Sequence, residues 1–491
     1  MRILLLSFLS ALFIALPHAS AFDGKQSGDV LIKNVTIVSS HLKTPLIGQN
    51  VHIANGRIAS ISPKSIDVSN QTQTIDGTNQ YLTPGIMDGH IHVSSIAGLG
   101  FTSDIKTKEH PVIAKSYLEQ EARSHLYHGI TQLLDPNPGA SWEQYLESPV
   151  RPTAFRCEVI TSPETFPYIE KPAAIAAELF PYVISETEKN KTTPSIEKTV
   201  QDIAASGAIC IKLYFEDGYG NSSEWPLLKP ETIAQITSDA KKHNLFVMAH
   251  VNATDMYQAA LASDIDILAH GIWNWGADNR SRELPESVKQ VLDTVLKKKI
   301  GFMPSQRVMA GLGELMLPET LEDPKLKKIV PADILNWYRQ DEAGWFKSEI
   351  IQGFDNLPPE QIAAIVQYGF LRRGRDAMLY LHQAGHPMLL GSDTPSSPSY
   401  ANQPGLNSYQ ELVMMAEAGI PLNNVLEAAT INNALQFKLN KDFGTVETGK
   451  IANLLLLTKN PLETVEAWDN IDTVILNGKP IARESLSAQN K

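Results

Sequence analysis

Between Pro84 and about Lys441 the chain alternates short apolar runs with helical patterns, and this alternation constrains the fold more than any other feature. Alternating strands and helices are typical of βα units around a parallel sheet, and eight such units predict a (β/α)8 barrel. The eight predicted strands are GIMDGHIHV (85–93), GITQLLD (129–135), TAFRCEVI (153–160), AICIKLYF (208–215), LFVMAH (245–250), IDILAH (265–270), IGFMP (300–304) and PMLLGSD (387–393). The predicted fold class is therefore α/β, a TIM-like barrel with its active site at the carboxyl ends of the strands.

The two ends of the chain have a different texture, with β-branched alternation broken by Asn-Gly and Asp-Gly pairs that favour hairpins. We expect these two segments to pair into one small β-sandwich domain. The predicted domains are a signal peptide (1–21), the first part of the β domain (22–83), a metal-dependent hydrolase barrel (84–441) and the second part of the β domain (442–491).

One interval of the barrel is too long for a simple crossover. Residues 305–385 contain helical patterns rich in aromatic residues. Two interpretations stay open: an outer helical subdomain with its own aromatic core, or a lid over the catalytic mouth, where long loops shape substrate access.

The first 21 residues have the form of a cleavable signal peptide. A short positive start precedes an apolar stretch from Ile3 to Leu16, and Ala19-Ser20-Ala21 supplies the small residues that signal peptidase accepts. The stretch is shorter than the ~20 residues of a spanning helix, although an uncleaved anchor is the alternative. We expect cleavage after Ala21, a periplasmic or secreted protein, and no stable membrane anchor.

Composition excludes some classes of function. A net charge of −12 argues against a nucleic-acid binder, which needs a basic face. Only two cysteines are present, Cys157 and Cys210, so the chain is not a disulfide-stapled scaffold. A single bridge between them and two buried thiols are both compatible with the sequence.

Polar residues recur where the predicted strands end. The first strand carries two imidazoles two residues apart, which the pleat directs to one face. Neutral imidazoles suit Zn²⁺ and related divalent ions. A buried lysine with a lowered pKa can add CO2, and the resulting carbamate can bridge two metals. The candidate metal ligands are His90, His92, Lys212, His250, His270 and Asp393.

The segment TPGIMDGHIHV resembles the opening motif of the amidohydrolase superfamily, and the later residues follow that superfamily's order. The context IKLYF around Lys212 most resembles the imidazolonepropionase-like branch, which includes Xaa-Pro dipeptidases with a carbamylated lysine. The resemblance implies that His90, His92 and Asp393 hold one metal and that His250 and His270 hold a second. Lys212, as a CO2-derived carbamate, would bridge the two ions, which are expected to be zinc.

Two further residues are candidates for substrate contact. Tyr214 shares the face of Lys212 and could orient a substrate carbonyl; a stacking role at the mouth is the alternative. Arg307 could pair with a substrate carboxylate, and a structural ion pair is the alternative. Glu216 and Asp217 are expected to be solvated.

These features predict an exported, metal-dependent amidohydrolase acting on a C–N bond of a small substrate, most simply a dipeptide or an N-acyl amino acid. A metal-bridged hydroxide would attack the carbonyl, with Asp393 as the proton shuttle. Hydrolysis of a cyclic amide and deamination of a heterocycle are the enzymatic alternatives. A non-catalytic binding barrel is disfavoured because all six candidate ligands are present. The expected partner is the small-molecule substrate, and the sequence leaves a homo-oligomer open.

Overall fold

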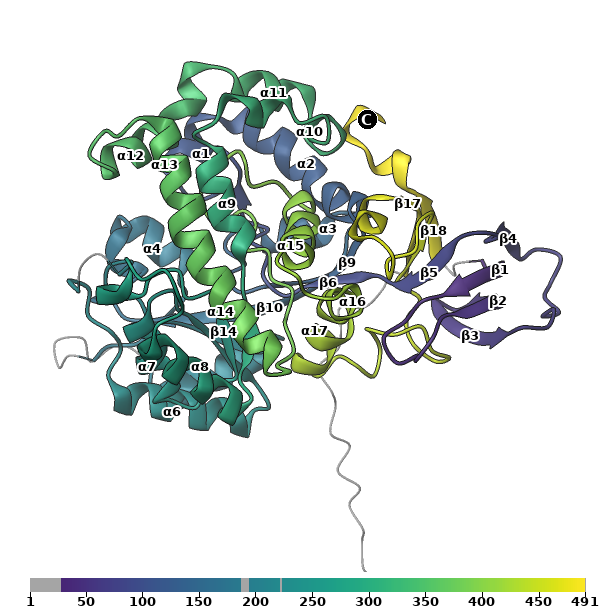
Figure 1. Ribbon diagram of the computed structural model, residues 1–491, viewed down its shortest axis with the longest axis horizontal. Helices are drawn as coiled ribbons and strands as arrows, with labels where there is room; N and C mark the ends of the chain where they lie inside the picture. Colours follow the sequence, from purple (N-terminus) through teal and green to yellow (C-terminus); the bar gives the residue numbers. More distant parts are fainter. Residues whose placement is uncertain (1–27, 187–193, 221–222, 491) are drawn as a thin grey trace, which may run out of the picture.

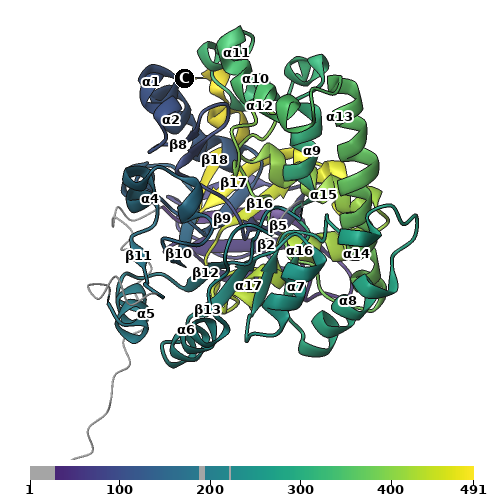
Figure 2. The ribbon, with the colours of Figure 1, turned by 90° about the vertical axis from the view of Figure 1, so that its left-hand side faces the viewer.

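The computed structural model describes residues 28–186, 194–220 and 223–490. The predicted signal peptide lies outside these residues. A barrel sheet wrapped by helices forms the main body, and a second sheet projects from one side (Figures 1 and 2). None of the helices in the described part combines the length and apolarity needed to span a membrane.

Seven of the eight predicted barrel strands form regular strands that pair in parallel in the expected order. A short strand, β11 (Tyr182–Val183), adds to β10. The barrel strands are β6 (Ile86–Asp88), β9 (Ile130–Asp135), β10 (Thr153–Thr161), β12 (Cys210–Tyr214), β13 (Phe246–His250), β14 (Ile267–Ala269) and β15 (Gly301–Met303).

The eighth predicted strand, 387–393, is irregular but closes the barrel between β15 and β6. The backbone N–H of Leu389 donates a hydrogen bond to the carbonyl of Phe302 at 3.0 Å, and the carbonyl of Leu390 accepts one from the N–H of Gly89 at 2.9 Å. Regular strand geometry breaks at Asp393, whose φ of 52° lies in the left-handed region. The barrel prediction is therefore confirmed, with a last strand that bends where it delivers a functional side chain.

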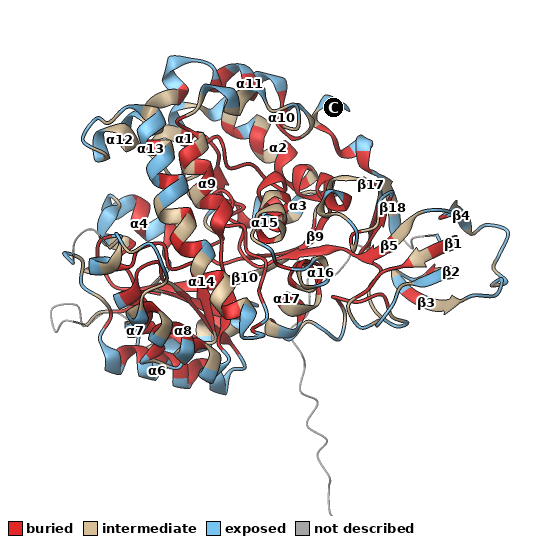
Figure 3. Ribbon diagram, viewed as in Figure 1, coloured by how far each residue is buried: buried red, intermediate tan, exposed pale blue. Residues whose placement is uncertain are grey.

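Amphipathic helices cover the barrel, and their buried stripes face the sheet (Figure 3). In α8, for example, Val288, Val291, Leu292 and Val295 recur at helical spacing and are buried. The helices outside the 305–385 segment are α1 (Ile105–Glu109), α2 (Pro111–Tyr127), α3 (Trp142–Glu147), α4 (Ala173–Leu179), α5 (Ile196–Ala205), α6 (Pro230–Lys242), α7 (Thr254–Leu261), α8 (Glu286–Lys298), α15 (Leu406–Glu417), α16 (Leu422–Ala429) and α17 (Ile431–Gln436).

The two chain ends form one small sheet domain, as the sequence predicts. β5 joins them, because it pairs with β1 on one side and with β16 on the other. The Asn55-Gly56 pair turns the β2–β3 hairpin with φ values of 52° and 73°, as expected of such pairs. Hydrogen bonds join all the strands in one mixed sheet rather than in the two separate sheets that a sandwich implies. The strands are β1 (Val30–Ile37), β2 (Leu46–Ala54), β3 (Arg57–Ser62), β4 (Gln73–Asp76), β5 (Tyr81–Pro84), β16 (Leu454–Leu457), β17 (Ile471–Leu476) and β18 (Lys479–Ala482).

The 305–385 segment is a layer of helices that packs on the loop following the first barrel strand. The Tyr338 hydroxyl donates to the carbonyl of Ala97 at 2.8 Å, and the Trp345 indole donates to Gly98 at 2.9 Å. These contacts anchor the segment at the carboxyl end of the barrel. Its helices are α9 (Gln306–Glu314), α10 (Leu326–Ile329), α11 (Ala332–Tyr338), α12 (Trp345–Gly353), α13 (Pro359–Ile365) and α14 (Arg372–Gln383).

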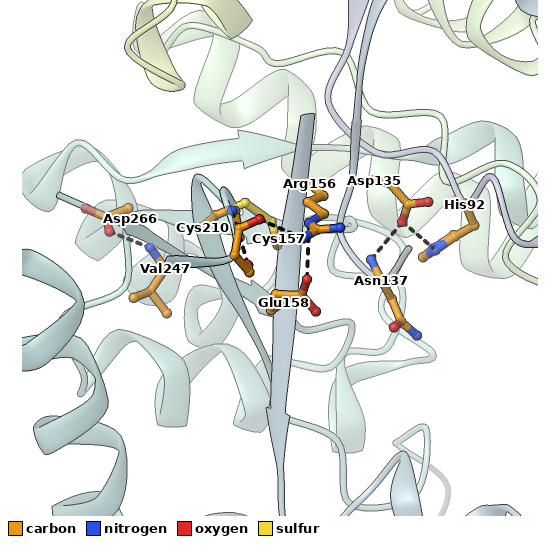
Figure 4. Close-up of a disulfide and its surroundings, with 11 residues drawn as sticks. His92, Asp135, Asn137, Arg156, Cys157, Glu158, Cys210, Val247 and Asp266 are labelled. Carbon is orange, nitrogen blue, oxygen red and sulfur yellow. Dashed lines mark hydrogen bonds and ion pairs between the residues drawn. A yellow bond between two sulfur atoms is a disulfide. The ribbon is translucent and has the colours of Figure 1, made fainter. Parts of the chain in front are cut away.

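A disulfide joins Cys157 to Cys210, which resolves the alternative that the sequence leaves open. The two residues are register partners on the adjacent strands β10 and β12, and both are fully buried (Figure 4). The bridge lies two residues before Lys212 on β12. It therefore ties together two strands of the barrel close to the candidate site.

Replacing both residues, Cys157→Ala with Cys210→Ala, is expected to lower the free energy of unfolding by about 4 kcal/mol. The bridge closes a loop of 53 residues, and opening that loop restores conformational entropy to the unfolded chain. Urea denaturation of the oxidised protein and the double variant measures the difference. Equal midpoints would show that the bridge contributes nothing to stability.

Candidate metal centre

The barrel brings all six predicted ligands to the carboxyl ends of its strands. His90 and His92 follow β6, Lys212 is in β12, and His250 ends β13. His270 comes directly after β14, and Asp393 ends the irregular eighth segment. The carboxyl ends of the strands therefore meet at one end of the barrel, as predicted.

Asp393 is at the centre of the group. One of its oxygens lies 3.2 Å from His90 Nε2 and 3.1 Å from His92 Nε2, and the other lies 3.5 Å from His270 Nδ1. Side-chain atoms of His90, His270 and Asp393 all lie within 4.8 Å of one another, a spacing that fits a single metal ion. Asp393 thus contacts imidazoles from both of the predicted metal sites.

The protonation states suit metal binding. Burial holds the pKa of His90 and His270 well below the ordinary histidine value, so both rings are neutral at pH 7. Burial raises the pKa of Asp393, but the facing imidazoles outweigh it and keep this pKa well below its usual range. The centre therefore presents neutral nitrogen ligands and an anionic oxygen, which suit divalent metals.

Lys212 is the most deeply buried cation of the centre, with 1% of its surface exposed. Its Nζ atom has no hydrogen-bond partner within the described part of the chain and lies 5.8 Å from the ring centroid of Tyr214. Burial lowers the pKa of Lys212 to about 7, against the opposing attraction of Asp393. An unpartnered buried amine beside His90 and Asp393 fits a group that binds a ligand or is modified.

The backbone is strained where two of these side chains are placed. His270 has a φ of 83° and Asp393 one of 52°, conformations that residues with a side chain seldom adopt. Tyr257 donates a hydrogen bond to the carbonyl of His270, and the Asp393 amide donates to the carbonyl of His90 at 2.8 Å. These contacts hold the turns that aim both side chains inward.

A model of the amidohydrolase family matches residues 81–481. The chain belongs to the amidohydrolase family. Membership places it among metal-dependent hydrolases that act on carbon–nitrogen bonds, and the cluster around Asp393 is a candidate site for the divalent ions that the family uses.

Similar proteins agree with the fold of this amidohydrolase. An Xaa-Pro dipeptidase with bound methionine aligns with a TM-score of 0.64 and 17% identity, over 93% of this chain and 100% of the other. A prolidase complexed with N-methylphosphonate-L-proline aligns with a TM-score of 0.65 and 18% identity, over 92% of this chain and 99% of the prolidase. The adenine deaminase of Ruegeria pomeroyi is 36% identical over 73 residues, which are 15% of this chain and only 12% of the deaminase.

Two buried carboxylates lie behind the first two histidines of the amidohydrolase centre. Asp135 lies 3.8 Å from His92 Nδ1 and accepts backbone N–H groups of Val93 and Asn137, at 2.9 and 2.8 Å (Figure 4). Asp88 accepts the His90 amide at 2.9 Å and the hydroxyl of Ser408 at 2.6 Å. The main-chain hydrogen bonds fix the backbone around His90 and His92, and the Asp135 carboxylate lies close to the outer ring nitrogen of His92.

Glu216 orients His250, and its position corrects the sequence prediction. The sequence predicts that Glu216 and Asp217 are solvated, whereas Glu216 is 1% and Asp217 8% exposed. A carboxylate oxygen of Glu216 lies 3.2 Å from His250 Nε2 and accepts the Asn252 amide at 2.7 Å. The Nε2 atom then carries the proton, which leaves Nδ1 of His250 free for a metal.

Replacing Glu216 with glutamine is expected to weaken metal binding by about tenfold or more, because the carboxylate that orients His250 is lost. A competition titration with a chromophoric zinc chelator measures the affinity. Asp217→Asn is the matched control, since this neighbouring acid forms no ion pair or hydrogen bond with a candidate ligand in the described part of the chain. Equal zinc affinity in wild type and Glu216→Gln would exclude this orienting role.

The two predicted substrate contacts differ in outcome. Tyr214 lies beside His250, with the two ring centroids 5.1 Å apart. The role of Tyr214 toward a substrate stays a prediction. Arg307 forms the structural ion pair: its two terminal nitrogens contact Glu314 at 2.7 and 2.5 Å, and it is 2% exposed. The guanidinium is thereby occupied within α9 instead of facing a substrate.

An aromatic wall stands beside His250. The ring of Phe166 stacks on Trp225 at 5.1 Å and meets the edges of Tyr219 and Tyr214 at 5.6 and 5.4 Å. Phe166 also lies 6.0 Å from the His250 ring, and Tyr219 is 44% exposed. The wall offers an apolar, partly open surface at the mouth of the barrel.

Proposed function

We propose that this protein is an exported, metal-dependent hydrolase of an acyclic amide bond in a small substrate, a dipeptide or an N-acyl amino acid. The observation that carries the proposal is the contact of Asp393 with imidazoles that follow the first and sixth barrel strands, beside the buried amine of Lys212, which has no hydrogen-bond partner among the described residues. This arrangement combines metal ligands with a carboxylate that can move a proton.

His90, His92, His250, His270 and Asp393 would hold two divalent ions, which we propose to be zinc because imidazole and carboxylate ligands suit it. When bound, such ions polarise an amide carbonyl and make water a stronger nucleophile at neutral pH. Asp393 accepts a proton from the attacking water and returns it to the leaving nitrogen, so the products are a carboxylic acid and an amine.

Lys212 is proposed to be carbamylated. Burial lowers its pKa to about 7, so a large share of the amine is neutral at that pH. The neutral nitrogen can attack CO2, forming an N–C bond and releasing one proton. The product carries an anionic oxygen pair at a position that otherwise holds an unpartnered donor.

The structural neighbours support a dipeptide-like substrate, since they include a dipeptidase and a prolidase. The aromatic wall beside His250 supports an apolar side chain in that substrate. The disulfide supports export, because such bonds persist in oxidising compartments.

Deamination of a heterocycle is the second candidate, favoured by the short match to adenine deaminases. One experiment separates the two. Zinc-loaded protein in bicarbonate buffer is incubated with pooled dipeptides, pooled N-acyl amino acids, cyclic amides and adenine. Amine release from the acyclic pools supports the proposal, and deconvolution then identifies the side chain. Release of ammonia from adenine with no amine release from the acyclic pools would contradict the proposal in favour of deamination. Opening of the cyclic amides alone would contradict it in favour of a cyclic amide hydrolase.

A further inference from the structure

A second cluster beside the metal centre contains a buried cation without an anionic partner. Arg373 on α14 is 7% exposed, and among the described residues its guanidinium donates to the carbonyls of Trp273 and Asn279, at 2.5 and 3.3 Å. No carboxylate in the described part of the chain forms an ion pair with it. Burial lowers the pKa of Arg373 to about 10, and the adjacent cation Arg372 adds to this effect.

Two neighbouring side chains carry buried polar atoms without a partner: Trp273, whose carbonyl accepts from Arg373, and Gln306, which packs against Gly374, the residue after Arg373. Gln306 is 2% exposed, yet neither its side-chain amide nitrogen nor its amide oxygen has a hydrogen-bond partner among the residues that the structure describes. The indole nitrogen of Trp273 is likewise buried and unpartnered. Buried polar groups are rarely left in this condition, so three together indicate a position that a ligand completes.

Two glycines let the backbone lie directly against the Gln306 and Trp273 side chains. A Cβ atom on Gly271 would lie 2.9 Å from the Trp273 indole nitrogen and 3.0 Å from the Gln306 amide nitrogen. A Cβ atom on Gly374 would lie 2.7 Å from Trp273 Cδ1 and 2.9 Å from the Gln306 amide oxygen. The sequence thus keeps the amide, the indole and the α14 backbone close together.

The cluster adjoins the candidate metal centre. The ring of Trp273 lies 5.4 Å from that of His270, and Trp273 supplies the carbonyl that holds the Arg373 side chain. Gln306 follows β15 at the carboxyl end of the barrel, where substrates of such barrels bind. A group bound here would therefore belong to the same substrate as the amide at the metals.

We propose that Arg373, Gln306 and Trp273 form the binding site for a substrate carboxylate beside His270. A planar guanidinium matches a carboxylate, and uncharged N–H donors can complete its hydrogen bonds. Arg307 shows the contrast, because its guanidinium is already paired with Glu314. The inference rests on the proposed function and assigns residues to one part of it, the binding of the free carboxylate that a dipeptide or an N-acyl amino acid carries.

Binding tests the site independently of turnover. The probes are 3-phenylpropanoate and 3-phenylpropanamide, titrated calorimetrically into the zinc-loaded protein. We expect the wild type to bind the acid more tightly than the amide. Arg373→Met should lower the affinity for the acid by about 100-fold and leave the affinity for the amide unchanged. Arg375→Met is the control, because Arg375 is an exposed neighbour on α14. Equal affinity of acid and amide in wild type, or an unchanged acid affinity in Arg373→Met, would overturn the inference.

A second variant covers the case in which Arg373→Met fails to fold. Gln306→Glu keeps the arginine but places an anion beside the proposed carboxylate. It should therefore lower the affinity for the acid by about tenfold or more and leave the affinity for the amide unchanged. In turnover, the wild type should prefer N-acyl amino acids to their C-terminal amides, and both variants should remove that preference. Hydrolysis of both pools at equal rates would contradict the carboxylate site yet leave the proposed function intact. Selective acid binding without any hydrolysis would contradict the proposed function yet support the site.

Discussion

Asp393→Asn is expected to lower kcat by roughly 10³-fold, the scale of general acid–base catalysis. The asparagine keeps the size of the side chain but can neither accept the proton of the attacking water nor return it to the leaving nitrogen. It also removes the anion that contacts His90, His92 and His270. The measurement is kcat at saturating zinc and substrate, together with the unfolding midpoint.

Asp376→Asn is the matched control for this variant. Asp376 forms ion pairs with Arg372 and Arg375 on α14 and has no proposed role in the proton transfer. The kcat of Asp376→Asn should therefore stay within about twofold of the wild-type value, the scatter expected of surface changes. A folded Asp393→Asn protein with the wild-type kcat would show that the proton travels by another group.

Lys212→Ala is expected to reduce bound zinc from two ions per chain to one or none. The proposed carbamate is the ligand shared by both ions, and alanine removes it without leaving a charge in its buried position. Elemental analysis of the dialysed protein counts the ions. Activity should fall with the metal content.

Lys198→Ala is the control for this second variant, because Lys198 is an exposed residue of α5 paired with Asp202. It should retain the wild-type zinc content and rate. Two ions per chain and full activity in Lys212→Ala would refute the bridging role of this lysine.

Much of the barrel could be predicted from sequence because its signals are local. Short apolar runs identify the strands, and the period-2 pleat places His90 and His92 on one face, where both now contact Asp393. The same rule of polar residues at strand ends also applies to Asp135, which ends β9 and lies beside His92. That residue could have been found by the argument that found the histidines.

Other features depend on which elements meet in space. Glu216 looks like a loop residue, but the turn after β12 folds it against His250 and Asn252. The bridge between Cys157 and Cys210 follows from strand register, which pairs these two residues across β10 and β12. Neither fact is contained in local sequence.

The pairing of Arg307 shows an intermediate case. Arg307 and Glu314 are seven residues apart on α9, which is two helical turns, so an ion pair between them is foreseeable once the helix is placed. Arg373 is the opposite case, because its lack of an acidic partner is visible only when every neighbouring element is known. The proposed carboxylate site therefore depends on the three-dimensional arrangement and has no signal in the local sequence.

The most direct test of a metal-dependent amide hydrolase is amine release measured against metal content in the same sample. The protein is stripped with a chelator, reloaded stepwise with zinc in bicarbonate buffer, and assayed on N-acyl amino acids at each step. We predict no release from the stripped protein and a rate that rises until two ions are bound per chain. Amine release that persists in the fully stripped protein would contradict the account.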